Sequence, residues 1–263
     1  MEYALVAGGS KGIGYAIAEA LARRRYNLIL IGRHIGALND AKHKLQSKYK
    51  IEVEVLQMDL STDEAAEEIL KWLQASKLPL KILCNVAGLG GAKDYLTLPL
   101  EQVRYMVRLN IESDAALCMT LIPLLEKNNP AYILNVGSMA GFSPIPVKNM
   151  YAATKSAVIF FSYGLRYQLK NRGISVSCLC PGPVFTKEEI RKDTIEKLGW
   201  FGKMMAVSPA DVGEIAVRRT LNGRMIIIPG LLAKTMGIFL RLLPRRMIVM
   251  VYDMLGGDEK QKY

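Results

Sequence analysis

The stretch "VAGGSKGIG" (residues 6–14) carries four glycines within seven positions, between a short apolar run and the helical pattern "YAIAEALARRR". A strand-to-helix loop without side chains lets a pyrophosphate approach the backbone, and the helix N-terminus points unpaired N–H groups at it. The stretch therefore predicts a nucleotide-binding loop. Its spacing, Gly8-x-x-x-Gly12-x-Gly14, departs from the usual G-x-G-x-x-G, and glycine-rich turns also form for purely conformational reasons.

Short apolar runs alternate with helical patterns along the chain, which is typical of a parallel sheet covered by helices on both faces. Several runs, such as "LILI" and "ILNV", are continuously apolar, as expected of strands buried on both faces. We predict seven strands, at residues 4–7, 28–31, 52–57, 81–85, 132–136, 175–180 and 225–228. Helices are expected at 12–25, 36–49, 62–75, 100–126, 151–171 and 209–221. The predicted fold class is α/β, with a doubly wound parallel sheet of seven strands.

The chain has 263 residues, enough for one large α/β domain, and it contains no repeat, low-complexity tract or proline-rich linker. We expect one domain over residues 1–230, with residues 231–263 as a helical extension of the same domain. The apolar residues 3–7 lead straight into the glycine loop without a basic flank or a cleavage site, so an intracellular, cytoplasmic protein is expected.

The formal net charge of +11 would suit nucleic acid, an anionic membrane surface or a phosphorylated ligand, and does not choose among them. No groove-reading or base-stacking motif accompanies the charge, so no nucleic-acid partner is expected. The four cysteines lie in apolar stretches, without zinc-like spacing and remote from the two histidines. We expect buried, reduced thiols and no metal site.

Ser138, Tyr151 and Lys155 form the pattern S-x12-Y-x3-K. Residues four apart in a helix share one face, and an ammonium beside a phenol favours the phenolate, the form that takes part in proton transfer. A Y-x3-K pair alone is common on helix surfaces. Here "NVGSMAG" (residues 135–141) also places Ser138 just past a predicted strand, where α/β sheets have their binding crevice. The combination indicates a catalytic site.

With these motifs the sequence resembles the short-chain dehydrogenase/reductase family over residues 3–230, in its NADP(H)-preferring type with a Rossmann-like fold. "AGGSKGIG" looks like the family's glycine motif, and "MDL" (58–60) like its adenine-contacting aspartate. "NVAG" (85–88) is similar to the family's N-N-A-G, although Val86 stands where the second asparagine is usual. "RLNIES" (108–113) supplies the helical Asn110, and "PGPVFT" (181–186) resembles the P-G motif after the sixth strand.

The resemblance implies an oxidoreductase that interconverts a carbonyl and an alcohol. Tyr151 would give a proton to the substrate oxygen, or take one in reverse, and Ser138 would orient that oxygen. Lys155 would favour the tyrosinate and hold the nicotinamide ribose, while Asn110 would position a water that connects Lys155 to solvent. The residues expected to bind the cofactor are Gly8, Ser10, Lys11, Gly12, Ile13, Gly14, Arg33, Asp59, Leu60, Asn85, Ala87, Gly88, Tyr151, Lys155, Pro181, Gly182, Val184 and Thr186.

The charges near the end of the second predicted strand indicate which cofactor is bound. An NAD-selective site has a carboxylate near the end of the second strand, whereas this chain has Arg33 there. The planar fork of Arg33 suits a 2′-phosphate, and Lys11 in the glycine loop could close the other side. NADP(H) is therefore expected. The alternative is that both residues are ordinary solvated cations.

The substrate pocket is expected from residues 89–99, 139–150 and 183–207, the last being a lid whose inner face carries Phe185, Ile190, Leu198, Trp200, Phe201, Met204 and Met205. An apolar, lipid-, acyl- or steroid-like ketone fits this pocket, although core packing explains much of the pattern too. The alternative substrate is a small ketone, sugar or polyol. A non-catalytic redox sensor and a nucleotide-sugar epimerase are less favoured, because the catalytic residues are all present and the chain after Gly230 is short.

Residues 231–252 contain Lys234, Arg241, Arg245 and Arg246, no acid before Asp253, and otherwise mostly apolar side chains. No uncharged run reaches the ~18 residues that span a membrane. Pro244 divides the segment into two short helical pieces, which fit either peripheral contact with a membrane or packing over the pocket or a second subunit. The resemblance also implies a homodimer or homotetramer through the helices at 100–126 and 151–171.

Overall fold

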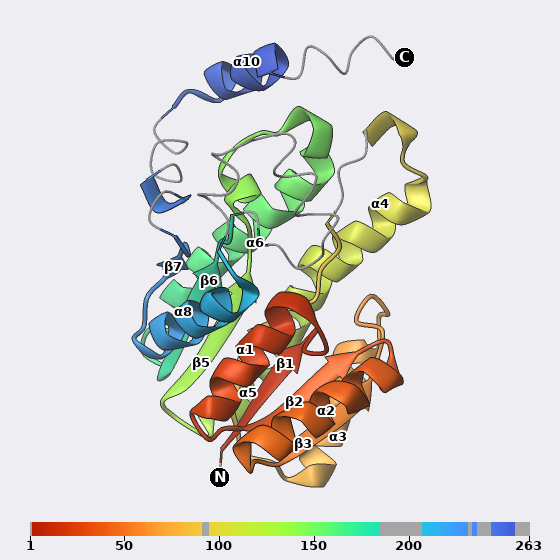
Figure 1. The fold of residues 1–263 in the computed structure, drawn as a ribbon, viewed down its shortest axis with the longest axis vertical. Helices are drawn as coiled ribbons and strands as arrows, with labels where there is room; N and C mark the ends of the chain where they lie inside the picture. The colour runs from red at the N-terminus through yellow and green to blue at the C-terminus, as the bar shows by residue number, and fades with distance from the viewer. Residues whose placement is uncertain are drawn as a thin grey trace.

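The computed structural model describes residues 2–90, 95–182, 184, 207–230, 233–235 and 243–255. Its centre is one sheet of seven parallel strands in the order β3-β2-β1-β4-β5-β6-β7 (Figure 1). The strands are β1 (Tyr3–Ala7), β2 (Asn27–Gly32), β3 (Val53–Gln57), β4 (Leu80–Asn85), β5 (Ala131–Val136), β6 (Ile174–Leu179) and β7 (Ile226–Ile227). The strand order reverses between β1 and β4, which makes the carboxyl end of this pair the topological switch point where open α/β sheets bind ligands.

Helices cover both faces of the sheet. Among the described residues, α1 (Gly12–Arg23), α2 (Ile35–Tyr49) and α8 (Pro209–Leu221) pack on one face, and α3 (Ala65–Ser76), α5 (Ser113–Glu126) and α6 (Asn149–Gln168) pack on the other. Helices α4 (Leu100–Val107) and α10 (Arg245–Leu255) lie outside these two layers (Figure 1). The short turns are η1 (Tyr95–Thr97), η3 (Met139–Phe142) and η4 (Pro146–Lys148). A π-helical segment, η2 (Arg108–Glu112), joins α4 to α5. The predicted Rossmann-like α/β class and the seven strands are confirmed.

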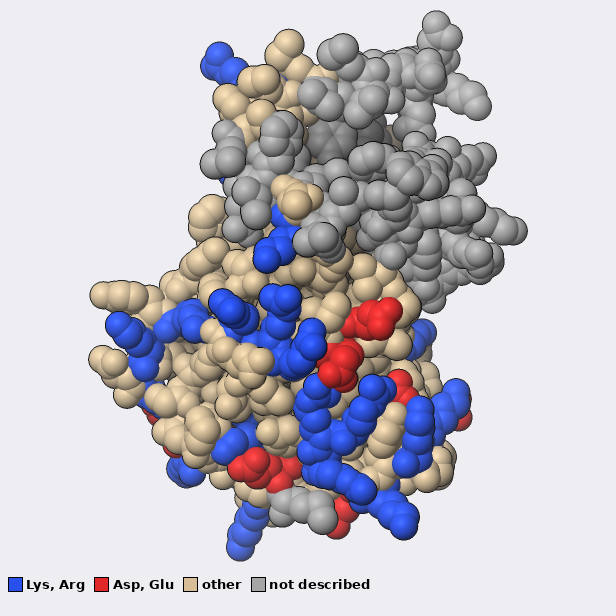
Figure 2. Space-filling view, turned by 60° about the vertical axis from the view of Figure 1, so that its left-hand side comes forward, with Lys and Arg blue, Asp and Glu red and all other residues tan. Residues whose placement is uncertain are grey.

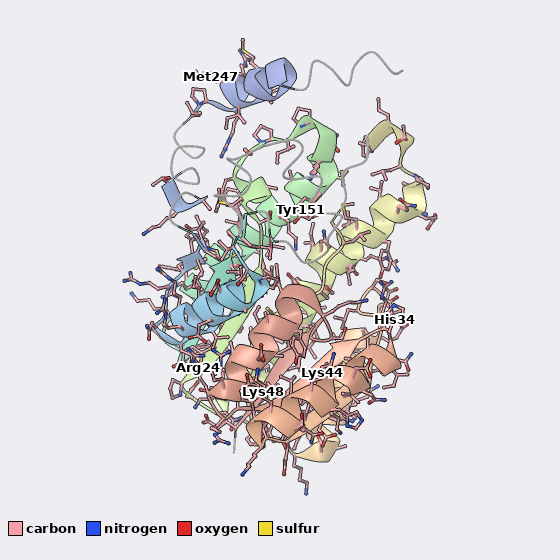
Figure 3. All side chains as sticks on the ribbon, in the orientation of Figure 1. Arg24, His34, Lys44, Lys48, Tyr151 and Met247 are labelled. Carbon is pink, nitrogen blue, oxygen red and sulfur yellow. The ribbon has the colours of Figure 1, made fainter. Side chains whose placement is uncertain are left out.

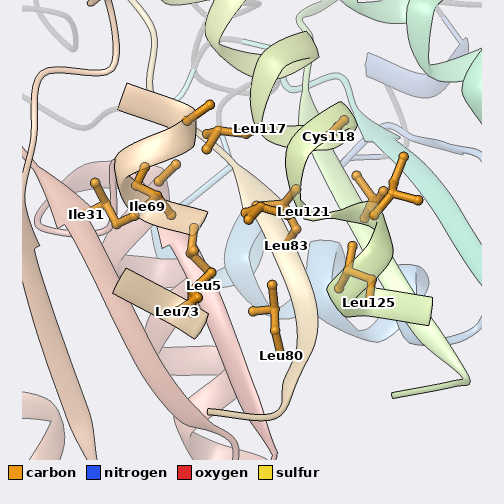
Figure 4. Close-up of a cluster of buried hydrophobic side chains, with 14 of the residues drawn as sticks. Leu5, Ile31, Ile69, Leu73, Leu80, Leu83, Leu117, Cys118, Leu121 and Leu125 are labelled. Carbon is orange, nitrogen blue, oxygen red and sulfur yellow. The ribbon is translucent and has the colours of Figure 1, made fainter. Parts of the chain in front are cut away.

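Two clusters of buried side chains hold the layers together. One joins the sheet to α1, α2 and α8, the helices on the near face in Figure 1. The other joins the opposite face to α3, α5 and α6; in Figure 4, Ile69 and Leu73 of α3 and Leu121 of α5 meet Leu5 and Leu83 of the sheet. Strands with helices on both faces must be apolar on both sides, which explains the continuous runs in the sequence.

The predicted boundaries mostly agree with the structure to within three residues. The helix expected at 100–126 contains the π-helical segment that the sequence pattern does not reveal. Cys84, Cys118, Cys178 and Cys180 are buried and free, as expected. The lid expected within 183–207 and most of the tail lie outside the described residues, and the domain division at residue 230 stays a prediction. Among the described residues, no helix is long and apolar enough to span a membrane.

The C-terminal helix α10 begins directly after Pro244, as the sequence predicts for the second piece of the tail. The Arg245 Nη1 atom donates a hydrogen bond to the Phe142 carbonyl at 2.5 Å, and Ile248 is only 2% exposed. Met247 and Met250 are 50% and 63% exposed, and Met247 is labelled on α10 in Figure 3. Helix α10 thus makes contacts near η3 and also presents apolar side chains to solvent.

Helices α1 and α8 approach each other closely at Gly213. A Cβ atom at Gly213 would lie 2.3 Å from the Ala16 carbonyl oxygen, a backbone atom that cannot move alone. An Arg24–Glu214 ion pair, with one hydrogen bond of 2.9 Å, fixes the same helix pair. The contact belongs to the cluster that positions the glycine loop, because α1 begins in that loop.

Replacing Gly213 by alanine is expected to lower the free energy of unfolding by about 1–3 kcal/mol, because overpacking here pushes two backbones apart. Gly164 on α6 is the matched control: it has no heavy atom within 4 Å of its would-be Cβ. Gly164→Ala should be neutral or stabilise by about 0.4–1 kcal/mol. Urea denaturation of both variants checks this, and equal effects would contradict the packing argument.

Candidate functional site

The predicted site residues follow the carboxyl ends of successive strands. The β1–α1 loop and the first turn of α1 hold Gly8, Ser10, Lys11, Gly12, Ile13 and Gly14. At the other strands, Arg33 follows β2, Asp59 and Leu60 follow β3, Asn85 ends β4 and Ala87 and Gly88 follow it, Ser138 follows β5, and Pro181, Gly182 and Val184 follow β6. The remaining residues lie on helices, with Tyr151 and Lys155 on α6 and Asn110 in η2. Thr186 lies outside the described residues. One edge of the sheet therefore brings together the described members of the set.

The glycine loop is held tightly against the end of β4. Gly8 has φ +87°, and a Cβ atom there would lie 2.8 Å from the Ala87 backbone nitrogen. A Cβ atom at Gly14 would come within 2.0 Å of the Gly8 carbonyl oxygen. Helix α1 starts at Gly12 without a side-chain cap, so its first N–H groups are available to a ligand. This bare loop and uncapped N-terminus fit the pyrophosphate of a dinucleotide.

The side chain of Lys155 extends from α6 to the end of β5 and is buried, with Lys155 only 4% exposed. Its Nζ atom donates a hydrogen bond to the Val136 carbonyl at 2.8 Å. Tyr151 lies one turn earlier on α6 and is half-buried; Figure 3 labels it on this helix. A Cβ atom at Gly90 would lie 3.9 Å from the Tyr151 ring. The loop after β4 thus passes beside the tyrosine.

Asn110 connects three elements from inside the π-helical segment. Its Oδ1 atom accepts the Leu89 N–H at 2.7 Å, and its Nδ2 atom donates to the Leu89 carbonyl and the Thr154 hydroxyl, both at 3.0 Å. A Cβ atom at Gly88 would meet both Asn110 Oδ1 at 3.2 Å and Lys155 Nζ at 3.3 Å. Gly88 therefore allows the amide and the ammonium to approach the same point.

Ser138 lies at the start of η3 and is 9% exposed. Its Oγ atom accepts the Ala140 N–H at 3.1 Å, which caps the turn. The next residue, Met139, donates its N–H to the Pro181 carbonyl at 3.0 Å. This bond joins the loops that follow β5 and β6, the two loops expected to form part of the substrate pocket.

After β2, where the sequence predicts the adenosine end of the cofactor, Arg33 donates from Nη1 to the Tyr105 hydroxyl at 2.7 Å. The Asp59 Oδ1 atom accepts the N–H of Ser61 at 3.0 Å and its hydroxyl at 2.8 Å. The sequence does not single out Tyr105 or Ser61, since a tyrosine inside a helix and a serine in a turn carry no distinctive pattern.

Asn85, which the sequence predicts as a cofactor-binding residue, belongs to a buried polar layer behind the site whose other members the sequence patterns do not single out. Asn85 donates to Asn135 Oδ1 at 2.9 Å, and Asn135 donates to the Ser162 hydroxyl at 3.0 Å. Asp114, one turn after Asn110, is fully enclosed. Burial raises the pKa of its carboxyl well above the ordinary 3.8, and the positive charge of Lys155 opposes that shift. Within "ILNV" and "SDAAL" these polar residues read as parts of apolar elements.

The family model described as short chain dehydrogenase matches residues 2–196. The chain therefore belongs to the short-chain dehydrogenase family, as the motifs predict. Very-long-chain 3-oxoacyl-CoA reductase-A of Danio rerio is 35% identical over 201 residues, which cover 74% of this chain and 62% of that protein. The match thus spans a little under two thirds of the length of this relative.

Solved structures support the fold assignment. A 7β-hydroxysteroid dehydrogenase superimposes with a TM-score of 0.84 at 20% identity, covering 95% of this chain and 96% of that one. An alcohol dehydrogenase of the archaeon Thermococcus sibiricus, complexed with 5-hydroxy-NADP, superimposes with a TM-score of 0.73 at 26% identity, covering 87% and 95% of the two chains.

The enclosed Asp114 should make the free energy of unfolding depend on pH. A carboxyl whose pKa is raised in the folded state loses stability as pH rises from its unfolded pKa toward its folded pKa, by up to about 1.4 kcal/mol per pH unit. Stability linked to Asp114 is thus fully present below about pH 4 and decreases above it. Asp114→Asn should remove this loss, so the variant should gain stability relative to the wild-type protein as the pH rises above about 4, measured by urea denaturation. A stability difference that stays constant with pH would contradict it.

Proposed function

We propose that the protein is an NADP(H)-dependent oxidoreductase that interconverts a carbonyl and an alcohol, with an apolar acyl ketone as substrate. The observation that carries the proposal is the convergence of Lys155 and Asn110 on Gly88, with Tyr151 one turn from Lys155. A buried ammonium beside a half-buried phenol at the carboxyl edge of a parallel sheet suits proton transfer at a ligand in the crevice. Membership of the short-chain dehydrogenase family supports the same reaction class.

In the direction of reduction, Tyr151 gives its phenolic proton to the substrate oxygen, and the Ser138 hydroxyl donates a hydrogen bond to that oxygen. The bound cofactor supplies the hydride. The Lys155 ammonium stabilises the phenolate that remains. Asn110 Oδ1 already accepts the Leu89 N–H and keeps a second lone pair for a water beside Lys155, through which solvent returns the proton.

The NADP(H) preference rests on Arg33 at the end of β2, where an NAD-selective site has a carboxylate. The 26% identical alcohol dehydrogenase, solved with 5-hydroxy-NADP, supports an NADP-type cofactor. The excess of basic side chains on the face in Figure 2 supports an anionic ligand in general, because it raises the local concentration of anions.

The acyl substrate is supported by the relatives, which are named very-long-chain 3-oxoacyl-CoA reductases. Their substrate joins a long apolar chain to a nucleotide that bears phosphates. Such a molecule suits both the apolar pocket expected from the sequence and the net charge of +11. A small ketone, sugar or polyol remains the alternative, and it would need a more polar pocket.

We expect NADPH oxidation with 3-oxoacyl substrates to become more efficient as the acyl chain lengthens, because each buried CH₂ adds about 0.8 kcal/mol until the pocket is filled.

Tyr151→Phe should bind NADPH like the wild-type protein but lose about a hundredfold or more in kcat. Tyr163→Phe, a partly exposed tyrosine on the same helix, is the control and should keep full activity. Activity of Tyr151→Phe within a few-fold of wild type would remove Tyr151 from the proton transfer, and a preference for short polar ketones would favour the alternative substrate.

A peripheral membrane contact through α10 fits a lipid-like substrate. Met247 and Met250 are exposed beside Arg245 and Arg246, so apolar insertion and attraction to anionic lipid would act together. The competing role, packing over the pocket, is supported by the Arg245–Phe142 hydrogen bond and the buried Ile248. Assembly into a homodimer or homotetramer stays a prediction, supported by the exposed Met119 of α5 and the exposed Phe160 of α6.

The membrane contact predicts that the full chain co-sediments with anionic vesicles at low salt and is partly released at high salt. The double variant Met247→Glu/Met250→Glu should lose vesicle binding and keep its fold, because both side chains face solvent. Ile35→Glu, which changes an exposed apolar side chain on α2, is the control and should bind vesicles normally. Equal sedimentation of the wild-type protein and both variants would refute the membrane contact. If a chain truncated after Gly230 lost substrate binding, the result would favour packing of the tail over the substrate pocket.

A further inference from the structure

Arg33 is held in place although its side chain is exposed. Its guanidinium carbon lies 5.6 Å from the centroid of the Tyr105 ring, and its Nη1 atom donates to the Tyr105 hydroxyl at 2.7 Å. The Gln57 side-chain amide donates to the Arg33 carbonyl at 3.0 Å, which fixes the backbone at the same residue. A long exposed side chain normally samples many rotamers, so these contacts restrict Arg33 before any ligand binds.

Tyr105 is well suited to hold the arginine. It lies on α4, and its ring is partly buried against the core cluster that includes α3 and α5. Burial, together with the nearby Asp59 carboxylate, raises the pKa of Tyr105, so the phenol stays neutral at physiological pH and serves as an acceptor. The fixed partner is thus the tyrosine, and the flexible partner is the arginine.

The contact leaves Arg33 able to bind a phosphate. A guanidinium has five N–H donors in one plane, and the Tyr105 hydroxyl accepts only one of them. The remaining donors can pair with two oxygens of a phosphate group. The tyrosine therefore orients the guanidinium without competing for the anion.

We propose that Tyr105 is a positioning residue for cofactor selection, which holds the Arg33 guanidinium ready for the 2′-phosphate of NADP(H). This role rests on the proposed NADP(H) preference. Its benefit applies only to ligands that carry the 2′-phosphate, since NAD(H) has an uncharged hydroxyl group in place of this phosphate. Tyr105 should thus affect selectivity rather than cofactor binding in general.

The experiment is a calorimetric titration of the full chain with NADPH, NADH, 2′,5′-ADP and 5′-AMP. Tyr105→Phe keeps the packed ring and removes the hydroxyl. It should weaken NADPH and 2′,5′-ADP by about three- to tenfold, the effect of one hydrogen bond, and leave NADH and 5′-AMP unchanged. In an Arg33→Ala background the same change should have no further effect, because the partner is absent. Tyr167→Phe, an exposed tyrosine on α6, is the control.

Equal weakening of NADPH and NADH by Tyr105→Phe would show a merely structural role and overturn the proposal, as would unchanged or tighter NADPH binding. Should Tyr105→Phe fold poorly, Tyr105→Leu replaces it and must show the same selective loss. Wild-type protein that binds NADPH and NADH equally would instead refute the NADP(H) preference itself, and with it the role of Tyr105. The two failures are thus distinguished by whether the wild-type or only the variant lacks the expected selectivity.

Discussion

A buried ammonium is the constraint on which the site depends. Lys155 is almost fully removed from water, and a charge in that position is costly unless hydrogen-bond acceptors and counter-charges surround it. The end of β5 provides the Val136 carbonyl, and the π-helical segment brings the Asn110 amide close to the same point. Gly88 leaves the space that both groups need. One charge thus links a strand end, a helix irregularity and a loop.

The two ends of the crevice follow different physical rules. Around Lys155 the groups are enclosed, so their electrostatic interactions act in a low effective dielectric and are strong. Around Arg33 the groups are exposed, so solvent and salt weaken each interaction. An exposed charge gains selectivity mainly when its orientation is settled in advance, and the packed ring of Tyr105 provides such an anchor. In the proposed function, proton transfer therefore depends on burial around Lys155, and cofactor selectivity depends on the order of the Arg33 side chain.

The sequence predicts the elements whose signals are local. Glycines at 8, 12 and 14, the continuous apolar runs and the S-x12-Y-x3-K spacing locate the loop, the strands and the catalytic candidates, because each pattern reflects a requirement of its own segment. The π-helical segment at Asn110 depends on partners from Leu89 and Thr154, which are distant in the sequence. The raised pKa of Asp114 and the contact of Tyr105 with Arg33 arise in the same way, from neighbours that only the folded chain brings together. Local periodicity cannot indicate such contacts.

The position of β1 in the middle of the sheet also governs how the protein can be made. On one side β1 pairs with β2, with Tyr3 opposite Asn27, and on its other side it pairs with β4, with Tyr3 opposite Leu80. The glycine loop acquires its close contact with Ala87 only when β4 is in place. During synthesis, residues up to Ala87, about the first third of the chain, must therefore leave the ribosome before the glycine loop can reach its final conformation, although this loop begins at Gly8. Until then the edge of β1 that later pairs with β4 can form hydrogen bonds with strands of other chains. Pairing with β4 protects this edge and brings Ala87 against the glycine loop.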